Sequence, residues 1–379
     1  MAKPLIDWYD DASHVFVNPL LPEGRKKLLK EAVNPYKDMK EHIWLASSGT
    51  ENFPKMIALS KKAMLASAKA VNTHLQIEKQ SSWLNILPLF HTGGLAIHAR
   101  AHLSGSQVFD FSENKWDPIQ YVKQLEEFNI SFSSLTPTHV YDIVSRSLLP
   151  PKSLKAIVVG GGVFPEKLQE KGHALGWPLL KSYGMTEICS QIATASSTHP
   201  HANLELLNHV NLRFSAEGFI EIRSDALLTG FVQGNDPDKR FIDPKVEGWY
   251  ISQDKGLATD GILQVFGRGA NFIKIGGENI SFSELETLWE NIKVKHNCCQ
   301  DVVLIDLPDE RLGRIVCLVK TGTEHIVHLD TLIDEYHKEV IPIAKIRQIY
   351  TVNAIPRSEL FKLKKHELRE CILKLDCGD

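Results

Sequence analysis

Short apolar runs that lead directly into polar, glycine-containing segments recur through the first half of the chain. These runs are HIWLASS, WLNILPLF, SFSSLTPT, LKAIVVGGG and PLLKSYGMTE. Stretches with apolar residues at helical spacing separate them, such as the stretch from an expected N-cap at Ser60 to about Gln76. Strands that alternate with helices over residues 43–195 predict a mostly parallel sheet covered by helices on both faces.

Polar loops follow these predicted strands at residues 47–55, 91–94, 160–162 and 183–187. Ligands of parallel α/β sheets bind outside the carboxyl ends of the strands. We therefore expect the loops to meet on one rim of the sheet and to form a single site there.

The pattern changes after residue 203, where short alternating runs such as GFIEIRS and GILQVFG predict antiparallel strands up to Arg268. The remaining chain predicts a compact α+β unit, with strands near 301–306 and 315–320 and helices near 283, 330–340 and 364. We expect a large domain over residues 1–268 and a small mobile domain over residues 269–379, with the boundary at Gly269–Ala270. Residues 1–40 are expected to be irregular, because prolines interrupt them at positions 4, 19, 22 and 35.

Length and composition agree with this division. The chain has 379 residues, more than one hydrophobic core usually supports. Its net charge of −3 gives no reason to expect nucleic acid or an anionic membrane as a partner. The sequence shows neither an apolar run of about 20 residues, as a membrane span needs, nor the apolar core of a signal peptide. The six cysteines lack paired-ligand spacing, so we expect a cytoplasmic protein without a zinc site or a disulfide framework.

The stretch SSGTENFPK, residues 47–55, has the chemistry of a phosphate-binding loop. Backbone N–H groups, hydroxyls and Lys55 are suited to surround phosphate oxygens. The Walker A pattern is absent, and Glu51 brings like charge to a site for a triphosphate. A plain strand-to-helix turn is the alternative interpretation.

Further loops carry nucleotide-binding chemistry, each with an ordinary alternative. Tyr183 could stack on a base, Thr186 could hold a phosphate and Glu187 could hold Mg²⁺, a hard cation that favours oxygen ligands. Gly160–Gly162 permits close backbone approach to a planar ligand, and Asp254 suits ribose hydroxyls. The alternatives are a ligand-free glycine turn and solvated carboxylates.

Three more residues stand at the ends of predicted elements. His91 could gate an acyl pocket, although the sequence places no carboxylate beside it. Arg268 lies at the predicted boundary, and Lys362 precedes the last helix. A strand-end histidine, a boundary residue and a helix-flanking charge are the alternative interpretations.

The order of these motifs over residues 45–365 resembles the adenylate-forming superfamily of acyl- and aryl-CoA ligases, luciferases and carrier-protein adenylation domains. The matching stretches are SSGTENFPK, PLFHTGG, GGG, YGMTE, the aspartate of YISQDKG, Arg268, IKIGGENIS…ELE and Lys362. Within this family the run LPLFHTGGLAIHARAHLSGS is most similar to the o-succinylbenzoate–CoA ligase branch of menaquinone biosynthesis.

The resemblance implies an ATP-dependent, AMP-forming acid–CoA ligase with Mg²⁺ and CoA. A carboxylate attacks the α-phosphate of ATP, the C-terminal domain rotates, and the thiol of CoA then attacks the acyl-adenylate. The implied roles are phosphate binding by Ser47, Ser48, Gly49, Thr50, Lys55 and Thr186, metal binding by Glu187, adenine binding by Gly160, Gly161, Gly162, Tyr183 and Gly184, ribose binding by Asp254 and Arg268, acyl-pocket gating by His91, and charge stabilisation by Lys362.

Several features depart from the family pattern. The stretch before the phosphate loop is shorter than in relatives, and three explanations stay open: a naturally compact chain, a truncated chain, or a homodimer that buries the exposed surface. Ala270 replaces the usual hinge Asp or Lys, and Phe361 replaces a glycine. Two alternative functions stay open: an enzyme that loads the thiol of a carrier protein, and a non-catalytic nucleotide-binding homologue. Candidates for binding a second acid carboxylate are Arg100 and His91.

Overall fold

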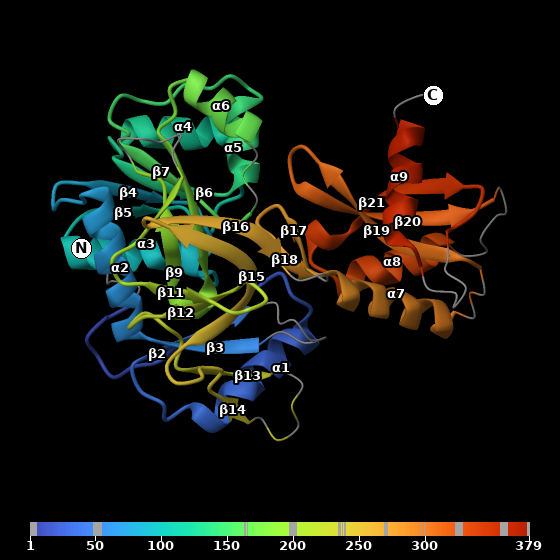
Figure 1. Ribbon diagram of the computed structural model, residues 1–379, viewed down its shortest axis with the longest axis horizontal. Coiled ribbons are helices and arrows are strands. Elements are labelled where there is room, and N and C mark those ends of the chain that lie inside the picture. Colours follow the sequence, from blue (N-terminus) through green and yellow to red (C-terminus); the bar gives the residue numbers. More distant parts are fainter. Residues whose placement is uncertain are drawn as a thin grey trace.

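The computed structural model describes the protein as a large sheet-rich part followed by a smaller α+β part (Figure 1). The described residues are 6–47, 55–162, 164, 166–196, 203–233, 236, 238, 240–268, 272–296, 298, 300–322, 329–356 and 363–376. The predicted α/β fold class is confirmed by this architecture.

One large sheet dominates the described residues before 269. Its strands, in spatial order, are β11 (Asn211–Phe214), β12 (Phe219–Arg223), β15 (Tyr250–Thr259), β16 (Ile262–Arg268), β10 (Leu204–Leu206), β9 (Ser190–Thr194), β8 (Leu179–Met185), β7 (Ala156–Val159), β6 (Phe132–Leu135), β4 (Ser82–Asn85) and β5 (Gln107–Asp110). From β8 to β5 the neighbours pair in parallel, as predicted. The strands from β9 to β11 pair antiparallel, which also agrees with the sequence pattern.

Apolar side chains cover both faces of the parallel strands, because successive residues of a strand point to opposite faces. On β7, Ile157 and Val159 pack with α4, α5 and α6, whereas Ala156 and Val158 pack with α2 and α3. These helices are α2 (Lys61–Leu75), α3 (Thr92–Ser104), α4 (Pro118–Glu127), α5 (Pro137–Val144) and α6 (Glu166–Ala174). The predicted N-cap at Ser60 is confirmed, since its side chain accepts a hydrogen bond from the N–H of Ala63.

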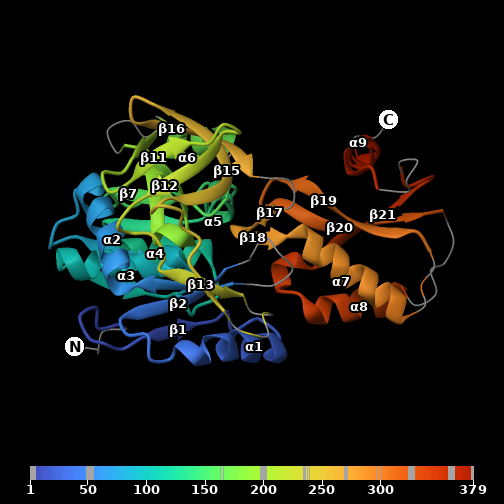
Figure 2. The same cartoon turned by 60° about the horizontal axis from the view of Figure 1, so that its bottom comes forward.

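A second sheet lies on the other side of α2 and α3 (Figure 2). Its strands, in spatial order, are β1 (His14–Phe16), β2 (His42–Ser47), β3 (Lys55–Ser60), β13 (Gly230–Gln233) and β14 (Phe241–Ile242). On β2, Ile43 and Leu45 pack towards α2 and α3, and Trp44 packs towards α1 (Glu23–Val33). Helices and sheets therefore alternate in layers through this part of the molecule.

The position of the stretch 47–55 corrects one expectation. We expected the HIWLASS strand to join the parallel sheet and to lead through a loop towards a helix. Instead β2 pairs antiparallel with β3, with Ser47 opposite Lys55, so the stretch connects two hairpin strands. The run KMIALS forms β3 because its apolar residues are buried between α1 on one face and α2 and α3 on the other.

Two further predictions were only partly correct. Residues 1–40 are not irregular throughout, because α1 begins directly after Pro22 and ends before Pro35. Prolines that bound a helix do not break it, since the first helical turn lacks intrahelical N–H partners in any case. The strand predicted at WLNILPLF ends at Asn85, whose side chain accepts a hydrogen bond from the N–H of Leu87 at 3.1 Å.

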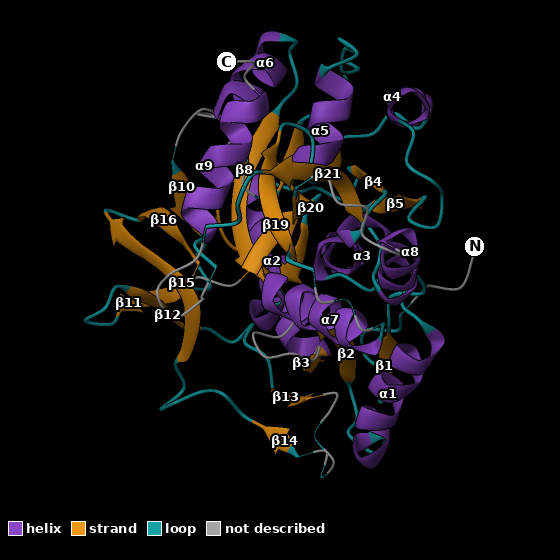
Figure 3. Cartoon of the chain, turned by 90° about the vertical axis from the view of Figure 1, so that its right-hand side faces the viewer, coloured by secondary structure: helices purple, strands orange, loops and turns teal. Residues whose placement is uncertain are grey.

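The C-terminal part contains a three-stranded sheet of β19 (Val302–Asp309), β20 (Gly313–Thr321) and β21 (Ile346–Val352). One face packs on α7 (Phe282–Lys295), α8 (Leu329–Glu339) and the short helix η3 (Pro342–Ala344), and the other face packs on α9 (Lys365–Asp376) (Figure 3). The hairpin of β17 (Phe272–Ile275) and β18 (Glu278–Ser281) turns at Gly276–Gly277 and lies between this sheet and the large one (Figure 1).

The predicted boundary at Gly269–Ala270 lies outside the described residues, so the division into domains 1–268 and 269–379 stays a prediction. We refer to the described residues up to 268 as the N-terminal part and to those from 272 as the C-terminal part. Within the described residues, no helix is both long and apolar enough to cross a membrane.

Candidate active site

The two ends of the predicted phosphate loop meet across the β2–β3 hairpin. Ser47 pairs with Lys55 on the neighbouring strand, and the Lys55 ammonium lies 4.4 Å from the ring centroid of Phe231 on β13. The residues between them, 48–54, include Ser48, Gly49, Thr50 and Glu51 and lie outside the described residues. The hairpin therefore fixes where the loop begins and ends.

The loop ends are tied to the Tyr183–Glu187 segment through the chain that precedes β13. The N–H of Leu228 donates to the carbonyl of Glu187 at 2.8 Å, and the N–H of Thr229 donates to the carbonyl of Ala58 on β3 at 2.9 Å. Thr186 and Glu187 begin a short 3₁₀ helix, η2 (Thr186–Ile188), which contacts β3. The structure thus brings two of the predicted phosphate-binding segments together.

Tyr183 and Asp254 also meet, although 71 residues separate them. The Tyr183 hydroxyl donates to Asp254 Oδ2 at 2.7 Å. Asp254 on β15 pairs with Arg268 on β16 through the backbone, so both predicted ribose residues lie side by side on neighbouring strands. The side chain of Arg268 is not among the described side chains.

Glycines at the carboxyl ends of β7 and β8 leave room where other residues would collide. A Cβ atom on Gly160 would lie 2.7 Å from Ser182 Oγ, and one on Gly184 would overlap the backbone at Ser190. Gly161 has φ +78°, which favours glycine. Gly162, the last residue of the glycine segment 160–162, lies against Pro137.

The C-terminal part presents another glycine to this rim. A Cβ atom on Gly277 would lie 2.8 Å from Thr136 Cγ2, and Gly277 has φ +95°. A Cβ atom on Gly161 would lie 3.5 Å from the Gly277 carbonyl oxygen. The turn of β17–β18 therefore lies directly on the rim formed by the ends of β6 and β7.

His91 has a carboxylate partner that the sequence did not reveal. His91 Nε2 lies 2.8 Å from Glu278 Oε1, and both side chains are partly exposed. Burial alone would lower the pKa of His91, but the Glu278 carboxylate outweighs burial and raises this pKa above 6.5. Glu278 follows the Gly-Gly pair of IKIGGENIS, and only the fold brings it across 187 residues.

Arg100 on α3 is buried, and its guanidinium makes fewer hydrogen bonds with the described residues than it can donate. Its exposed fraction is 1%, and its Nη2 donates to Ser190 Oγ at 3.1 Å. The Nε and Nη1 atoms have no hydrogen-bond partner among the described residues. Burial lowers the pKa of Arg100 to about 9, so the guanidinium stays protonated at neutral pH in an environment that favours an added anion.

No group of three or more His, Cys, Asp or Glu side chains within the described residues is placed to hold a metal ion. Glu187 remains suited to Mg²⁺, which usually binds through one or two carboxylates together with substrate phosphates. A magnesium site of that kind needs no further protein cluster.

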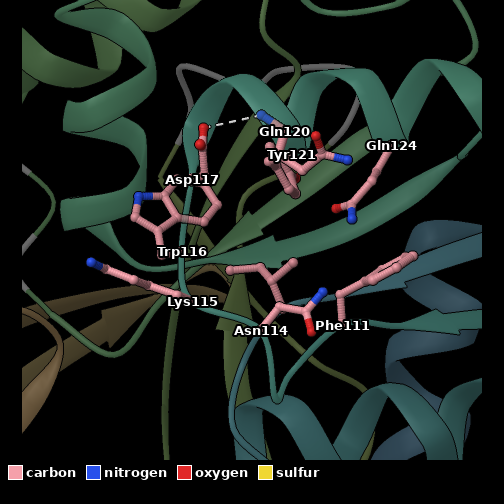
Figure 4. A pocket seen from close by; sticks show the side chains of 9 residues that line it. Phe111, Asn114, Lys115, Trp116, Asp117, Gln120, Tyr121 and Gln124 are labelled. Carbon is pink, nitrogen blue, oxygen red and sulfur yellow. Dashed lines mark hydrogen bonds between the residues drawn. The ribbon is translucent and has the colours of Figure 1, made fainter.

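A small pocket lies near the carboxyl ends of β4 and β5, between residues 111–117 and the first turns of α4 (Figure 4). Its lining comprises Ile86, Phe111, Asn114, Lys115, Trp116, Asp117, Gln120, Tyr121 and Gln124. None of these is a predicted nucleotide residue. The Trp116 indole donates from Nε1 to Asp142 at 2.8 Å, which links the pocket wall to α5.

Lys362 lies outside the described residues. Its described neighbours Ile355 and Leu363 belong to the cluster beneath α9. The β17–β18 turn faces the rim, since Gly277 lies against Thr136 and Gly161.

Comparison with known proteins gives matches over most of the chain. The family model for AMP-binding enzymes matches residues 18–211. A 2-succinylbenzoate–CoA ligase of Bacillus pumilus is 24% identical over 369 residues, which cover 94% of this chain and 74% of that ligase.

Solved structures share the fold. A double mutant of the o-succinylbenzoate CoA synthetase of Bacillus subtilis, bound with a product analogue, matches with a TM-score of 0.74 and 23% identity over 86% of this chain and 69% of its own. The same synthetase in complex with ATP and magnesium ion matches with a TM-score of 0.56 at 22% identity over the same shares. An amide bond synthetase of Marinactinospora thermotolerans matches with a TM-score of 0.73 and 19% identity over 87% of this chain and 69% of its own.

We predict that Tyr183→Phe weakens AMP binding roughly fivefold, because a lost orienting hydrogen bond is worth about 1 kcal/mol. The hydroxyl of Tyr183 holds Asp254 in place, and phenylalanine keeps the ring. Titration calorimetry with AMP measures the change, and thermal unfolding of both proteins is the control. Equal AMP affinity in the two proteins would show that the hydroxyl does not orient Asp254 for ribose.

Proposed function

The chain belongs to the AMP-binding enzyme family, and from this premise we propose that it is an ATP-dependent acid–CoA ligase of the o-succinylbenzoate type. The family match confirms the resemblance to adenylate-forming enzymes that the motif order indicated. A carboxylic acid, ATP with Mg²⁺, and CoA are the proposed small-molecule partners. The products are a thioester, AMP and pyrophosphate.

The observation that carries the proposal is the seating of the Gly277 turn on the glycine rim. Glycine at position 277 lets the backbone of the C-terminal part approach Thr136 and Gly161 closely at the end of the parallel sheet, where a Cβ atom on Gly277 would lie 2.8 Å from Thr136 Cγ2. The higher TM-score to the Bacillus subtilis structure with a product analogue than to the one with ATP supports this reading. We therefore assign the described arrangement to the second, thioester-forming step.

In the first step, the acid carboxylate attacks the α-phosphate of ATP and pyrophosphate leaves. The hairpin loop 47–55 and Thr186 would bind the phosphates, and Asp254 with Arg268 would bind the ribose. Glu187 would hold Mg²⁺, which neutralises phosphate charge when bound. Lys362 would neutralise the charge that develops between the carboxylate and the α-phosphate.

In the second step, the CoA sulfur attacks the acyl carbon, the bond to AMP breaks, and the thiol proton is lost to solvent or to a base. The C-terminal part then occupies the described arrangement, with Glu278 bound to His91. This bond turns the imidazole towards the C-terminal part and would leave the acyl pocket open to the thiol. His91 acts here by its position, as a gate.

Arg100 is the proposed site for a second carboxylate on the acid. Its buried guanidinium has two nitrogens without partners among the described residues. A buried unpaired charge is costly, and an anionic group of the substrate would compensate it. This assignment favours an aromatic or similar acid with two carboxylates.

Other parts of the proposal rest on the sequence alone. The division at residues 268 and 269, a cytoplasmic location and a homodimer remain proposals. A carrier protein in place of CoA is the alternative acceptor, and the fold does not separate the two, since an amide bond synthetase shares it.

We predict acid-dependent pyrophosphate exchange, with o-succinylbenzoate the best acid in a panel that includes benzoate and succinate monoesters. Arg100→Met should raise the KM for the diacid about 30-fold, the size of a lost charge-assisted hydrogen bond of about 2 kcal/mol, and leave monoacids unchanged. Methionine removes a buried charge that has no acidic partner among the described residues and keeps much of the side-chain volume, so the variant should fold. Absence of exchange with every acid would favour a non-catalytic homologue.

A second prediction separates the two steps. Lys362→Ala should slow pyrophosphate exchange by roughly 10²–10³, the usual cost of removing a donor aimed at developing charge. Thioester formation from preformed acyl-adenylate and CoA should stay close to the wild-type rate. Equal loss in both assays would contradict the role of Lys362 in the first step alone.

A third prediction concerns pH. Because the His91 pKa is raised in the described arrangement, the ion pair contributes fully below His91's ordinary value of 6.5 and is lost as pH rises through the raised pKa. The Glu278 carboxyl has a lowered pKa because His91 outweighs burial, so the contribution is also lost as pH falls below its ordinary 4.5. The ratio of wild-type to Glu278→Gln thioester rates should therefore fall towards one as pH rises above His91's ordinary pKa of 6.5. A ratio that does not change with pH would show that the His91–Glu278 pair does not stabilise the described arrangement.

A further inference from the structure

A second ion pair joins the two parts at a distance from the rim. Arg311 lies in the turn between β19 and β20, and Asp142 lies on α5. Arg311 donates from Nη2 to Asp142 Oδ2 at 2.7 Å and from Nε to Oδ1. Two parallel bonds between a guanidinium and a carboxylate fix direction as well as distance. We name this pair the Arg311–Asp142 latch.

The carboxylate of the latch is buried on the N-terminal part. Asp142 is 5% exposed, and the Trp116 indole donates to its Oδ2. Burial alone would raise the pKa of Asp142, but the hydrogen bonds from Arg311 and Trp116 outweigh it and hold the pKa below its ordinary value. Asp142 is therefore charged, and departure of Arg311 would leave a buried carboxylate whose charge is offset, among the described residues, by Trp116 and the nearby Arg146.

The turn that carries Arg311 is bonded to the Gly-Gly turn of the β17–β18 hairpin. Asp309 Oδ1 accepts hydrogen bonds from the N–H groups of Arg311 and Leu312, which holds the turn in shape. The N–H of Gly276 donates to the Leu312 carbonyl at 2.8 Å. A shift of Arg311 relative to α5 is thereby transmitted to Gly276 and Gly277.

Both turns rest on the same short helix of the N-terminal part. Thr136, which touches Gly277, is the N-cap of α5, and Asp142 lies near the C-terminal end of α5. The helix is held from inside by Val140 and Ile143, which pack into the core. One rigid element thus sets both the latch and the Gly277 contact.

We propose that Arg311 and Asp142 are positioning residues that hold the Gly277 turn on the glycine rim for thioester formation. The proposal rests on the proposed function, in which the described arrangement serves the second step. Neither side chain touches a reacting atom; they act through the Gly276–Leu312 bond and α5. Because the first step uses a rotated arrangement, the latch is absent there and contributes nothing to adenylation.

The kinetic test uses Arg311→Met, Asp142→Asn and the double variant. Each single variant should slow thioester formation from preformed acyl-adenylate about tenfold, the size of one partly exposed charge-assisted contact, with pyrophosphate exchange unchanged. The double variant should be no slower than the slower single variant, because residues of one pair are not additive. Arg311 is half-exposed, so its replacement leaves the fold intact even if Asp142→Asn unfolds.

Tyr141→Phe is the matched control. Tyr141 neighbours Asp142 on α5, and its hydroxyl donates to Glu310 of the same turn across a long, exposed contact of 3.4 Å. This variant should keep both half-reaction rates. Loss of thioester formation in Tyr141→Phe, parallel loss of both half-reactions in Arg311→Met, or additive effects in the double variant would overturn the latch.

Amide hydrogen exchange tests the latch without an assay of enzymatic activity. Arg311→Met should exchange faster than the wild type in peptides covering residues 272–281 and 309–312, with unchanged exchange in α2 and α3. Unchanged exchange in the two turns overturns the proposal even for an active ligase. Faster exchange there in a protein without ligase activity would support the latch and contradict the proposed function, so the two failures are distinguishable.

Discussion

Close approach of backbone to backbone at the end of the parallel sheet is the constraint on which the site depends. Gly161 and Gly277 both have positive φ, which favours glycine, and a Cβ atom on Gly277 would also collide with Thr136 Cγ2. Because Gly161 lies in the loop after β7 and Gly277 belongs to the C-terminal part, the same contact shapes the rim and joins the two parts. The covering layers of helices keep the strand ends fixed while this contact forms.

Ion pairs fix the orientation of the C-terminal part, which the glycine contact alone would not define. His91–Glu278 lies near the rim, Arg311–Asp142 lies at the far end of α5, and Arg25 on α1 pairs with Glu284 on α7 at 3.1 Å. Partly exposed pairs contribute little energy each, and their number and spread define one orientation of the C-terminal part. A joint of this kind holds a position and still releases it, as a two-step ligase requires.

The sequence predicted the parallel strands, the antiparallel region and the order of motifs, because these depend on local periodicity and on polar residues at strand ends. It did not predict that SSGTENFPK connects a hairpin, since pairing of β2 with β3 depends on a second sheet formed with β13, which lies far along the chain. Glu278 and Asp142 were missed for the same reason: each acts on a partner more than a hundred residues away. Prolines near residues 22–35 predict an irregular chain, whereas in the structure they flank α1.

The central claim is that the acid is activated as an acyl-adenylate before it meets the thiol. Labelling the reacting carboxylate of o-succinylbenzoate with ¹⁸O and analysing the products by mass spectrometry tests this directly. The carboxylate oxygen that attacks the α-phosphate leaves with AMP, so the account predicts one labelled oxygen in AMP for each thioester formed. Unlabelled AMP, or ADP in place of AMP, would contradict it.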